Sequence, residues 1–361
     1  MSLAARAAIR AMPAYLPPRE GRTGLRLDFN ENTLGCSPAV LAALRASSAE
    51  DLSRYPEYDA AERQITAAWG HSPATALLTN GVDDAIWLAV VTFLDPGDEA
   101  IVVTPTFAMY RFYCQQAGVA PVFVPCSSRE LGGGVRVFEL DMPALLAAVT
   151  PRTRAVFLAN PNNPTGHAIS ETVLLQLARR LPDCLIFADE AYADFVAPGH
   201  RGLLDAVAAT PNLVVARTFS KAYGLAGARL GCLFAPPGLV PDLRKAHSPY
   251  NVNTLALRCG LAALSDPAWA ADYCRQVIAS RAVVEQTLAA CAIPYWQSRA
   301  NFVLFEAGDR TDLLIAGLRR RGILIRDRRS DWPGAARISC GSVEQTTAAC
   351  AALRQLWEEP T

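Results

Sequence analysis

Residues 217–231 read RTFSKAYGLAGARLG, and the interpretation of the whole chain starts from them. They follow the apolar run 213–216, which has the length and composition of a buried strand. Thr218, Ser220 and Lys221 therefore lie just beyond the carboxyl end of that strand. Open α/β sheets bind their ligands at this end, so these polar residues are predicted to line a site.

Lys221 is one of only two lysines, the other being Lys245, although lysine and arginine together number 34. A lysine amine can lose its proton and attack an aldehyde, whereas an arginine guanidinium stays protonated. Lys221 is therefore the residue predicted to carry covalent chemistry.

The composition predicts a soluble, cytoplasmic protein without a metal site. The 361 residues are 51% hydrophobic and carry a formal net charge of zero, so no general attraction to nucleic acid or membrane is expected. The longest apolar run, 85–94, is too short to cross a bilayer, and the amino terminus lacks the order of a signal peptide. The ten cysteines form no C-x-x-C pair and are expected to be reduced thiols.

Short strands alternate with helical patterns through the first two thirds of the chain. The strands are predicted at 76–79, 101–103, 122–124, 155–158, 184–188 and 213–216. This alternation predicts a mainly parallel sheet covered on both faces by helices. Beyond Lys245 helices dominate, with strands near 302–305 and 337–339, which indicates a smaller α+β part.

The loops after these strands carry groups that complement a planar, phosphorylated aldehyde, pyridoxal phosphate. Lys221 would bind the aldehyde, and Asp189 would pair with the ring nitrogen so that the ring can accept electrons. Tyr192 and Asn163 fit the ring hydroxyl. The phosphate needs several donors and a positive charge, which are available at Gly81, Thr218, Ser220 and Arg229.

The motifs TFSK at 218–221, NPNNPTG at 160–166 and DEAY at 189–192, with Arg229 following, resemble the signatures of fold-type I pyridoxal-phosphate aminotransferases of class I and II. The resemblance spans nearly the whole chain. Further segments resemble the histidinol-phosphate aminotransferase subfamily, namely 27–35, 54–56, 105–111, 249–254, 300–302 and 322–328.

This resemblance implies an α/β fold with a large domain, built on a mostly parallel seven-stranded sheet between helices, and a smaller α+β domain. We expect an amino-terminal arm at 1–30, the large cofactor-binding domain at 31–247 and the small domain at 248–361. It also implies a homodimer whose subunits share their active sites.

The resemblance assigns roles to the matched residues. Lys221 would hold the cofactor as an imine and then move a proton between the substrate carbon and the cofactor, with Asp189 and Tyr192 as the other catalytic residues. Tyr110 would stack on the ring. The phosphate would be bound by Gly81, Val82, Asp83, Thr218, Ser220 and Arg229, and by Tyr55 of the neighbouring subunit.

On the substrate side, Arg337 resembles the family's carboxylate-binding arginine, a role that suits a bidentate guanidinium. Arg326 and Tyr15 resemble residues that contact the distal, phosphate-bearing part of the substrate. The expected substrate wall is completed by Asn30, Glu31 and Asn163.

Two positions depart from the subfamily pattern, since Thr33 stands where proline is usual and Phe107 where tyrosine is frequent. The leading interpretation is transfer of the amino group of L-histidinol phosphate to 2-oxoglutarate, a step of histidine biosynthesis. An aromatic amino-acid aminotransferase and a decarboxylase of the threonine-phosphate type remain alternatives. A binding protein that has lost catalysis is a further alternative, which the intact set of site residues disfavours.

Overall fold

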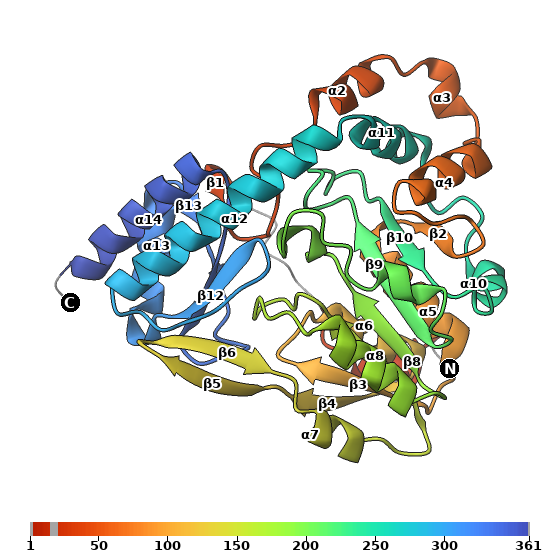
Figure 1. Ribbon diagram of the computed structural model, residues 1–361, viewed down its shortest axis with the longest axis horizontal. Coiled ribbons are helices and arrows are strands. Elements are labelled where there is room, and N and C mark those ends of the chain that lie inside the picture. The colour runs from red at the N-terminus through yellow and green to blue at the C-terminus, as the bar shows by residue number, and fades with distance from the viewer. Residues whose placement is uncertain (1–2, 15–20, 360–361) are drawn as a thin grey trace.

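The computed structural model describes residues 3–14 and 21–359. Its larger sheet has seven strands in the order β2-β10-β9-β8-β7-β3-β4. Within this sheet β10 runs antiparallel to both of its neighbours and the other pairs are parallel, which confirms the predicted mostly parallel sheet (Figure 1). The strands are β2 (Ala76–Thr79), β3 (Glu99–Thr104), β4 (Ala120–Pro125), β7 (Thr153–Ala159), β8 (Leu185–Asp189), β9 (Leu213–Thr218) and β10 (Gly231–Phe234).

Helices cover both faces of this sheet, because successive side chains of a strand point to opposite faces. In β8, Ile186 and Ala188 belong to one buried cluster, and Leu185 and Phe187 to the other. The second cluster packs against α5 (Gly81–Phe93), α6 (Met109–Ala117) and α10 (Val240–Ala246). The first packs against α4 (Tyr58–Ala67), α8 (Glu171–Arg180), α9 (Leu204–Val207) and α11 (Thr254–Ser265).

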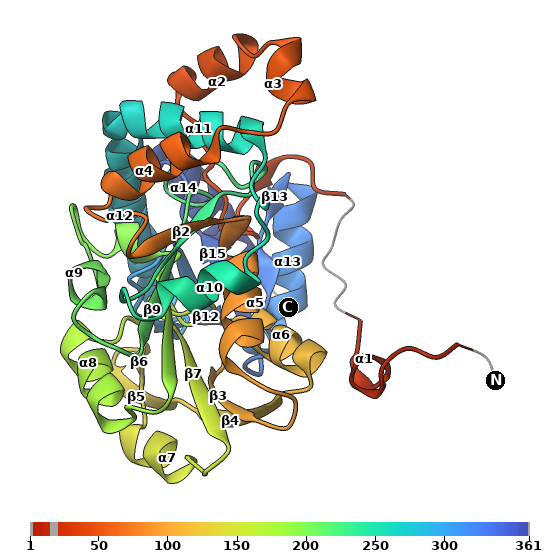
Figure 2. The same ribbon diagram turned by 90° about the vertical axis from the view of Figure 1, so that its right-hand side faces the viewer.

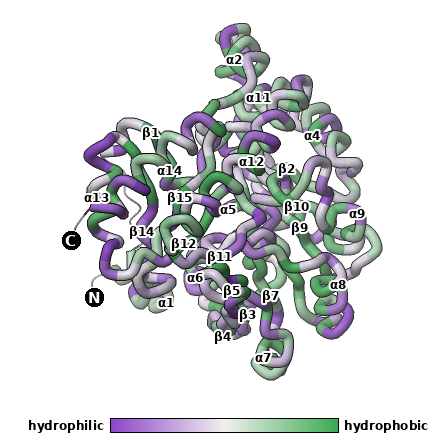
Figure 3. The backbone as a smooth tube through the Cα atoms, turned by 60° about the vertical axis from the view of Figure 1, so that its left-hand side comes forward, coloured by the Kyte–Doolittle hydropathy of each residue, from purple (hydrophilic) through white to green (hydrophobic). Residues whose placement is uncertain are grey.

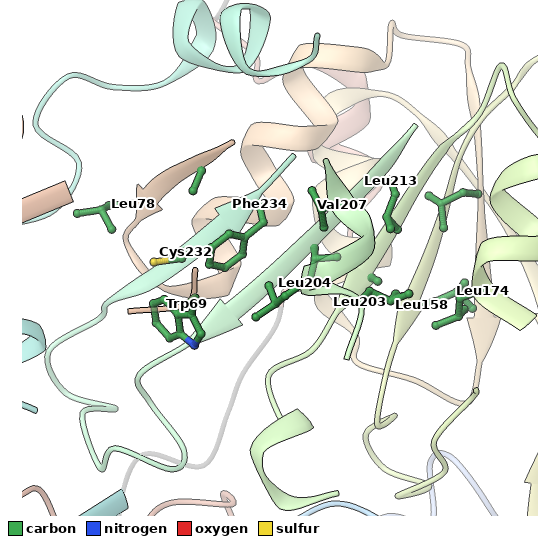
Figure 4. Close-up of a cluster of buried hydrophobic side chains, with 14 of the residues drawn as sticks. Trp69, Leu78, Leu158, Leu174, Leu203, Leu204, Val207, Leu213, Cys232 and Phe234 are labelled. Atoms are coloured by element: carbon green, nitrogen blue, oxygen red, sulfur yellow. The ribbon is translucent and has the colours of Figure 1, made fainter. Parts of the chain in front are cut away.

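Figure 4 shows part of the first cluster, in which Trp69 and Phe234 lie together at one end, and Leu158 and Leu174 at the other. The strands around β9 and β10 are accordingly coloured as hydrophobic along most of their length in Figure 3. This core holds the carboxyl ends of β7, β8 and β9 in fixed positions.

A second sheet has six strands in the order β14-β15-β12-β11-β6-β5. These are β5 (Ser127–Gly132), β6 (Val135–Glu139), β11 (Tyr295–Trp296), β12 (Phe302–Glu306), β14 (Arg326–Asp327) and β15 (Ala335–Ser339). Its core packs against α12 (Pro267–Ala290), α13 (Thr311–Arg320) and α14 (Val343–Glu358). The described chain also has a two-stranded sheet, β1 (Leu25–Arg26) with β13 (Ile323–Leu324), and the short helices α1 (Ala7–Ala11), α2 (Pro38–Arg45), α3 (Ala49–Ser53) and α7 (Met142–Ala147).

The hairpin β5–β6 belongs to the second sheet, although its residues lie in the sequence range expected for the large domain. Residues 127–139 fall inside the range 31–247, but β6 pairs with β11 of the second sheet, and Figure 1 shows the hairpin below β12 of the same sheet. The glycines at 132–134 form the turn of this hairpin, all with positive φ. β5 escaped prediction because it is exposed throughout and shows no apolar alternation. β6 escaped prediction because it is only five residues long and mostly half-buried. The three domain ranges stay a prediction.

The segment 25–30 runs along the second sheet and leads into the site. Leu27 donates its N–H to the Leu324 carbonyl at 2.8 Å, and Ser339 donates its N–H to the Leu27 carbonyl at 2.9 Å. Before this segment, α1 lies at the edge of the molecule in Figure 2, where it contacts α6. In the part of the chain that the structure describes, no helix is long and apolar enough to cross a membrane.

Candidate active site

A cavity of about 240 Å³ lies at the carboxyl ends of β7, β8 and β9, beside the start of α5. All residues predicted to bind the cofactor line this cavity, except Tyr55 and Gly81. The position follows from the topology, because parallel strands bring the loops after their carboxyl ends to one edge of the sheet.

Asp189 is the last residue of β8 and is 5% exposed. Its Oδ2 accepts a hydrogen bond from the Tyr110 hydroxyl at 2.7 Å, and its Oδ1 accepts one from the Ala191 N–H at 3.0 Å. Burial raises the pKa of Asp189 to about 6 even though both hydrogen bonds oppose the shift. Such a carboxylate is suited to pair with a protonated ring nitrogen, because a buried cation would offset its desolvation.

Lys221 enters the cavity from the loop after β9. Its Nζ donates a hydrogen bond to the Phe29 carbonyl at 3.2 Å and lies 5.7 Å from the centre of the Tyr192 ring. No carboxylate of the described residues forms an ion pair with this amine. The amine therefore lies at the cavity without a competing ion pair, in a position to attack an aldehyde.

The groups expected to bind a phosphate gather around Arg229. Arg229 has a left-handed φ of 56°, and its guanidinium lies 3.2 Å from an Asp83 carboxylate oxygen and 3.5 Å from Ser220 Oγ. Gly81 opens α5 with a φ of 77°, and a Cβ at this position would lie 2.5 Å from Arg229 Nη2. Only glycine therefore leaves room here for an anion to meet both the arginine and the backbone amides at the start of α5.

Tyr110 lines the cavity, but its ring packs on Phe157, with the ring centres 5.7 Å apart and the planes 17° apart. Burial raises the pKa of Tyr110 well above its ordinary value. The hydroxyl therefore stays protonated and donates a hydrogen bond to Asp189. The stacking of Tyr110 on a cofactor ring stays a prediction.

Arg337 lies on β15, outside the cavity wall and 4% exposed. It donates one hydrogen bond to Asn163 Oδ1 and another to the Asp28 carbonyl at 2.8 Å. Burial lowers the pKa of Arg337 to about 9. No carboxylate of the described residues forms an ion pair with it, so an anion that reached this guanidinium would be strongly favoured.

Of the other residues predicted to bind the substrate, Glu31 lines the cavity and Arg326 lies on β14. Arg326 pairs with Arg337 in the register of β14 and β15, and its guanidinium lies 5.1 Å from the centre of the Phe29 ring. Glu31 lines the cavity and forms ion pairs with Arg22 at 3.2 Å and Arg26 at 2.6 Å. Tyr15 lies outside the described residues.

Asn30, which is expected to form part of the substrate wall, is not among the residues that line the cavity. It is 1% exposed, and its side chain is hydrogen-bonded to Tyr192 and Ser339. An asparagine in a polar loop motif can serve the loop itself as readily as a ligand, and the substrate role of Asn30 stays a prediction.

Phe29 lines the cavity and was not singled out from the sequence. Its ring lies 3.8 Å from the Arg22 guanidinium and 5.1 Å from that of Arg326, while its carbonyl accepts the bond from Lys221. One aromatic residue inside the polar stretch 28–32 was the available signal.

The comparisons with known proteins agree with this geometry. The family model described as aminotransferase class I and II matches residues 22–353. Histidinol-phosphate aminotransferase of Dinoroseobacter shibae is 40% identical over 334 residues, covering 89% of this chain and 88% of that protein. The enzyme of the same name from Symbiobacterium thermophilum is 35% identical over 363 residues, covering 97% of each chain.

Among solved structures, histidinol-phosphate aminotransferase from Sinorhizobium meliloti in complex with pyridoxal-5'-phosphate superposes with a TM-score of 0.84 and 26% identity, covering 97% of this chain and 96% of that one. The resemblance drawn from the sequence motifs is thereby confirmed, and so is the fold class. The chain belongs to the class I and II aminotransferase family.

Proposed function

We propose that this protein is a pyridoxal-phosphate-dependent aminotransferase that transfers the amino group of L-histidinol phosphate to 2-oxoglutarate, in histidine biosynthesis. The observation that carries the proposal is the placement of Lys221, Asp189 and Arg229 around one cavity. Relatives named for this activity support the choice of substrate.

The described residues fit pyridoxal phosphate. Lys221 would bind the aldehyde, Asp189 the ring nitrogen, and Asn163 and Tyr192 the ring oxygen. The space that Gly81 leaves under Arg229 would take the phosphate. When bound, the cofactor supplies an electron sink for the substrate carbon that loses its proton.

The protein supplies proton transfer and orientation. Lys221 would be the base that removes the proton from the substrate carbon and the acid that delivers it to the cofactor carbon. Asp189 would keep the ring nitrogen protonated, and Arg337 would hold an anionic group of the substrate. A planar guanidinium binds a carboxylate and a phosphate equally well in geometry, so one site can serve both histidinol phosphate and glutamate.

The substrate assignment is tested by mixing the cofactor-loaded protein separately with L-histidinol phosphate, L-phenylalanine and L-glutamate. We expect histidinol phosphate to convert the cofactor to its amine form fastest, followed in the absorption spectrum within a single turnover. Equal or faster conversion by phenylalanine would reassign the protein to aromatic amino acids. With a phosphorylated amino acid such as threonine phosphate as a fourth substrate, release of carbon dioxide without any need for a 2-oxo acid would indicate the decarboxylase instead.

The proposed assembly is a homodimer with shared active sites. Tyr55 is 77% exposed and stacks on Tyr250 with ring centres 4.4 Å apart, away from the cavity of its own chain. An exposed pair of aromatic rings is typical of a protein interface. The ten unpaired cysteines suit a reducing compartment, and the cytoplasm is the proposed location.

Tyr55→Phe is expected to weaken retention of the cofactor by about tenfold, because one hydrogen bond to a charged phosphate is lost while the ring stays. Release of the cofactor on dilution or dialysis measures this change. Tyr250→Phe is the matched control, because it alters the neighbouring ring, to which the proposal gives no cofactor contact. Unchanged retention in a dimeric Tyr55→Phe protein would contradict the cross-subunit role.

A further inference from the structure

Asn30 contacts Tyr192 directly although it lies outside the cavity. Its Nδ2 donates a hydrogen bond to the Tyr192 hydroxyl oxygen at 3.1 Å. An amide nitrogen can only donate, so the phenol oxygen must act as acceptor in this contact. The hydroxyl proton of Tyr192 is therefore left for another partner.

A second contact fixes the orientation of the Asn30 amide. Its Oδ1 accepts a hydrogen bond from Ser339 Oγ at 2.8 Å, and the Asn30 N–H donates to the same Oγ at 3.1 Å. A flipped amide would place its NH₂ group against the Ser339 hydroxyl and its oxygen against the phenol. Among the described residues, Oδ1 is the acceptor to which the serine hydroxyl donates, and a flipped amide would leave that hydroxyl proton without an acceptor.

The backbone around Asn30 is also tied to the site. Its φ of 57° is left-handed, a conformation that asparagine adopts more readily than most residues. Its carbonyl accepts a bond from Asn301 Nδ2 at 3.2 Å. The preceding carbonyls, of Asp28 and Phe29, accept bonds from Arg337 at 2.8 Å and from Lys221 at 3.2 Å.

We propose that Asn30 is a positioning residue that directs the hydroxyl proton of Tyr192 toward the ring oxygen of the cofactor. The inference rests on the proposed cofactor, and it assigns the amino-terminal segment a part in the chemistry of the ring rather than in the substrate wall. Because hydrogen bonds in a chain polarise one another, the bond from Asn30 also strengthens the bond that the phenol donates.

The other groups around the phenol remain unchanged in the variants that test this proposal. Among the described residues, the titratable groups that interact with Tyr192 are Lys221, Arg337 and Tyr110, and the Phe302 ring meets the Tyr192 ring edge-on at 5.1 Å between centres. Asn30→Gly removes the amide, and glycine accepts the left-handed backbone without strain. Asn30→Asp keeps the size of the side chain but turns its donor into an acceptor, which draws the phenol proton away from the cavity.

The readout is a pH titration of the lysine adduct of the cofactor, monitored by its absorption spectrum in the absence of substrate. The midpoint of the titration is the pH at which half of the adduct has lost its proton. A hydrogen bond donated to the ring oxygen stabilises the deprotonated adduct, which carries the more negative charge. Loss of that bond should therefore raise the midpoint, by about half a pH unit for Asn30→Gly and about one unit for Asn30→Asp.

A double-mutant cycle with Tyr192→Phe separates positioning from general loosening. Asn30→Gly should shift the midpoint in the unmodified protein and leave it unchanged once the phenol is absent. An equal shift in both backgrounds, or none in either, overturns the proposal. Should the glycine variant not fold, Ser339→Ala tests the same orientation with residue 30 intact, and an unshifted midpoint there again overturns it.

This experiment distinguishes the proposal from the function on which it rests. If the unmodified protein forms no lysine adduct, the proposed function fails and the role of Asn30 fails with it. If the unmodified protein titrates normally and the variants match it, the aminotransferase stands and only the role of Asn30 is lost.

Discussion

Lys221→Ala is expected to lower turnover by about 10⁴-fold or more, because one residue supplies both the covalent anchor and the proton-transfer group. Alanine can neither form the adduct nor move the proton. The phosphate contacts and Asp189 remain, so the variant should still bind the cofactor. We expect a bound cofactor that shows the spectrum of the free aldehyde, together with product formation near the limit of detection.

Lys245→Ala is the matched control, because it removes the only other lysine. Lys245 is exposed and forms an ion pair with Asp242 at 2.7 Å, on α10 and outside the cavity. Exposed pairs of this kind contribute little to stability, so this variant should keep the adduct and its turnover. An active Lys221→Ala protein, or loss of the adduct in Lys245→Ala, would refute the assignment of Lys221.

The larger sheet could be predicted because its strands are short apolar runs separated by helices. The run at 213–216 corresponds to β9 (Leu213–Thr218), and the predicted strand 76–79 corresponds to β2. Such strands lie in the core, where hydrophobic sequence and burial coincide. The hairpin β5–β6 has no such signal, since it pairs at the outer edge of the second sheet. Its place depends on the partner strand β11, which lies more than 150 residues later in the sequence.

The candidate site could be predicted where chemistry restricts the residue type. A lysine after β9, an aspartate at the end of β8 and a glycine after β2 suit few ligands in combination. Lys221 and Asp189 line the cavity, and Gly81 lies against the guanidinium of Arg229, which also lines it. The partner of the Asn30 side chain could not be predicted, because an amide forms the same kinds of hydrogen bond with a ligand as with a neighbouring side chain. Only the structure separates these possibilities, through the distance from Asn30 to Tyr192.

Asp189→Asn is expected to have opposite effects on catalysis and on the stability of the cofactor-free protein. Without its carboxylate partner the ring nitrogen is a poorer electron sink, and turnover should fall by about 10²–10³-fold. In the cofactor-free protein, burial raises the pKa of Asp189 to about 6, above the value of about 3.9 for an exposed aspartate. Ionisation of this buried carboxylate therefore opposes folding at neutral pH, by roughly 3 kcal/mol for a shift of two units.

The sign of the pH dependence follows from the raised pKa. Below about pH 4 the carboxyl is neutral in the folded and the unfolded chain, so asparagine should confer no advantage there. Between about pH 4 and 6 the folded chain holds a proton that the unfolded chain has lost, and the unmodified protein loses stability as the pH rises. The cofactor-free variant should therefore melt at a higher temperature than the unmodified protein at pH 7.5, and the two should converge in acid.

Glu190→Gln is the contrasting control, since the next carboxylate in the chain is equally buried but is paired. Glu190 lies 2.8 Å from Arg217, and its other oxygen accepts the Leu203 N–H at 2.8 Å. Removal of its charge leaves a buried guanidinium short of its partner and should lower the melting temperature. Stabilisation by Asp189→Asn beside destabilisation by Glu190→Gln would identify Asp189 as a carboxylate kept for the cofactor. Destabilisation by both would mean that Asp189 serves the fold.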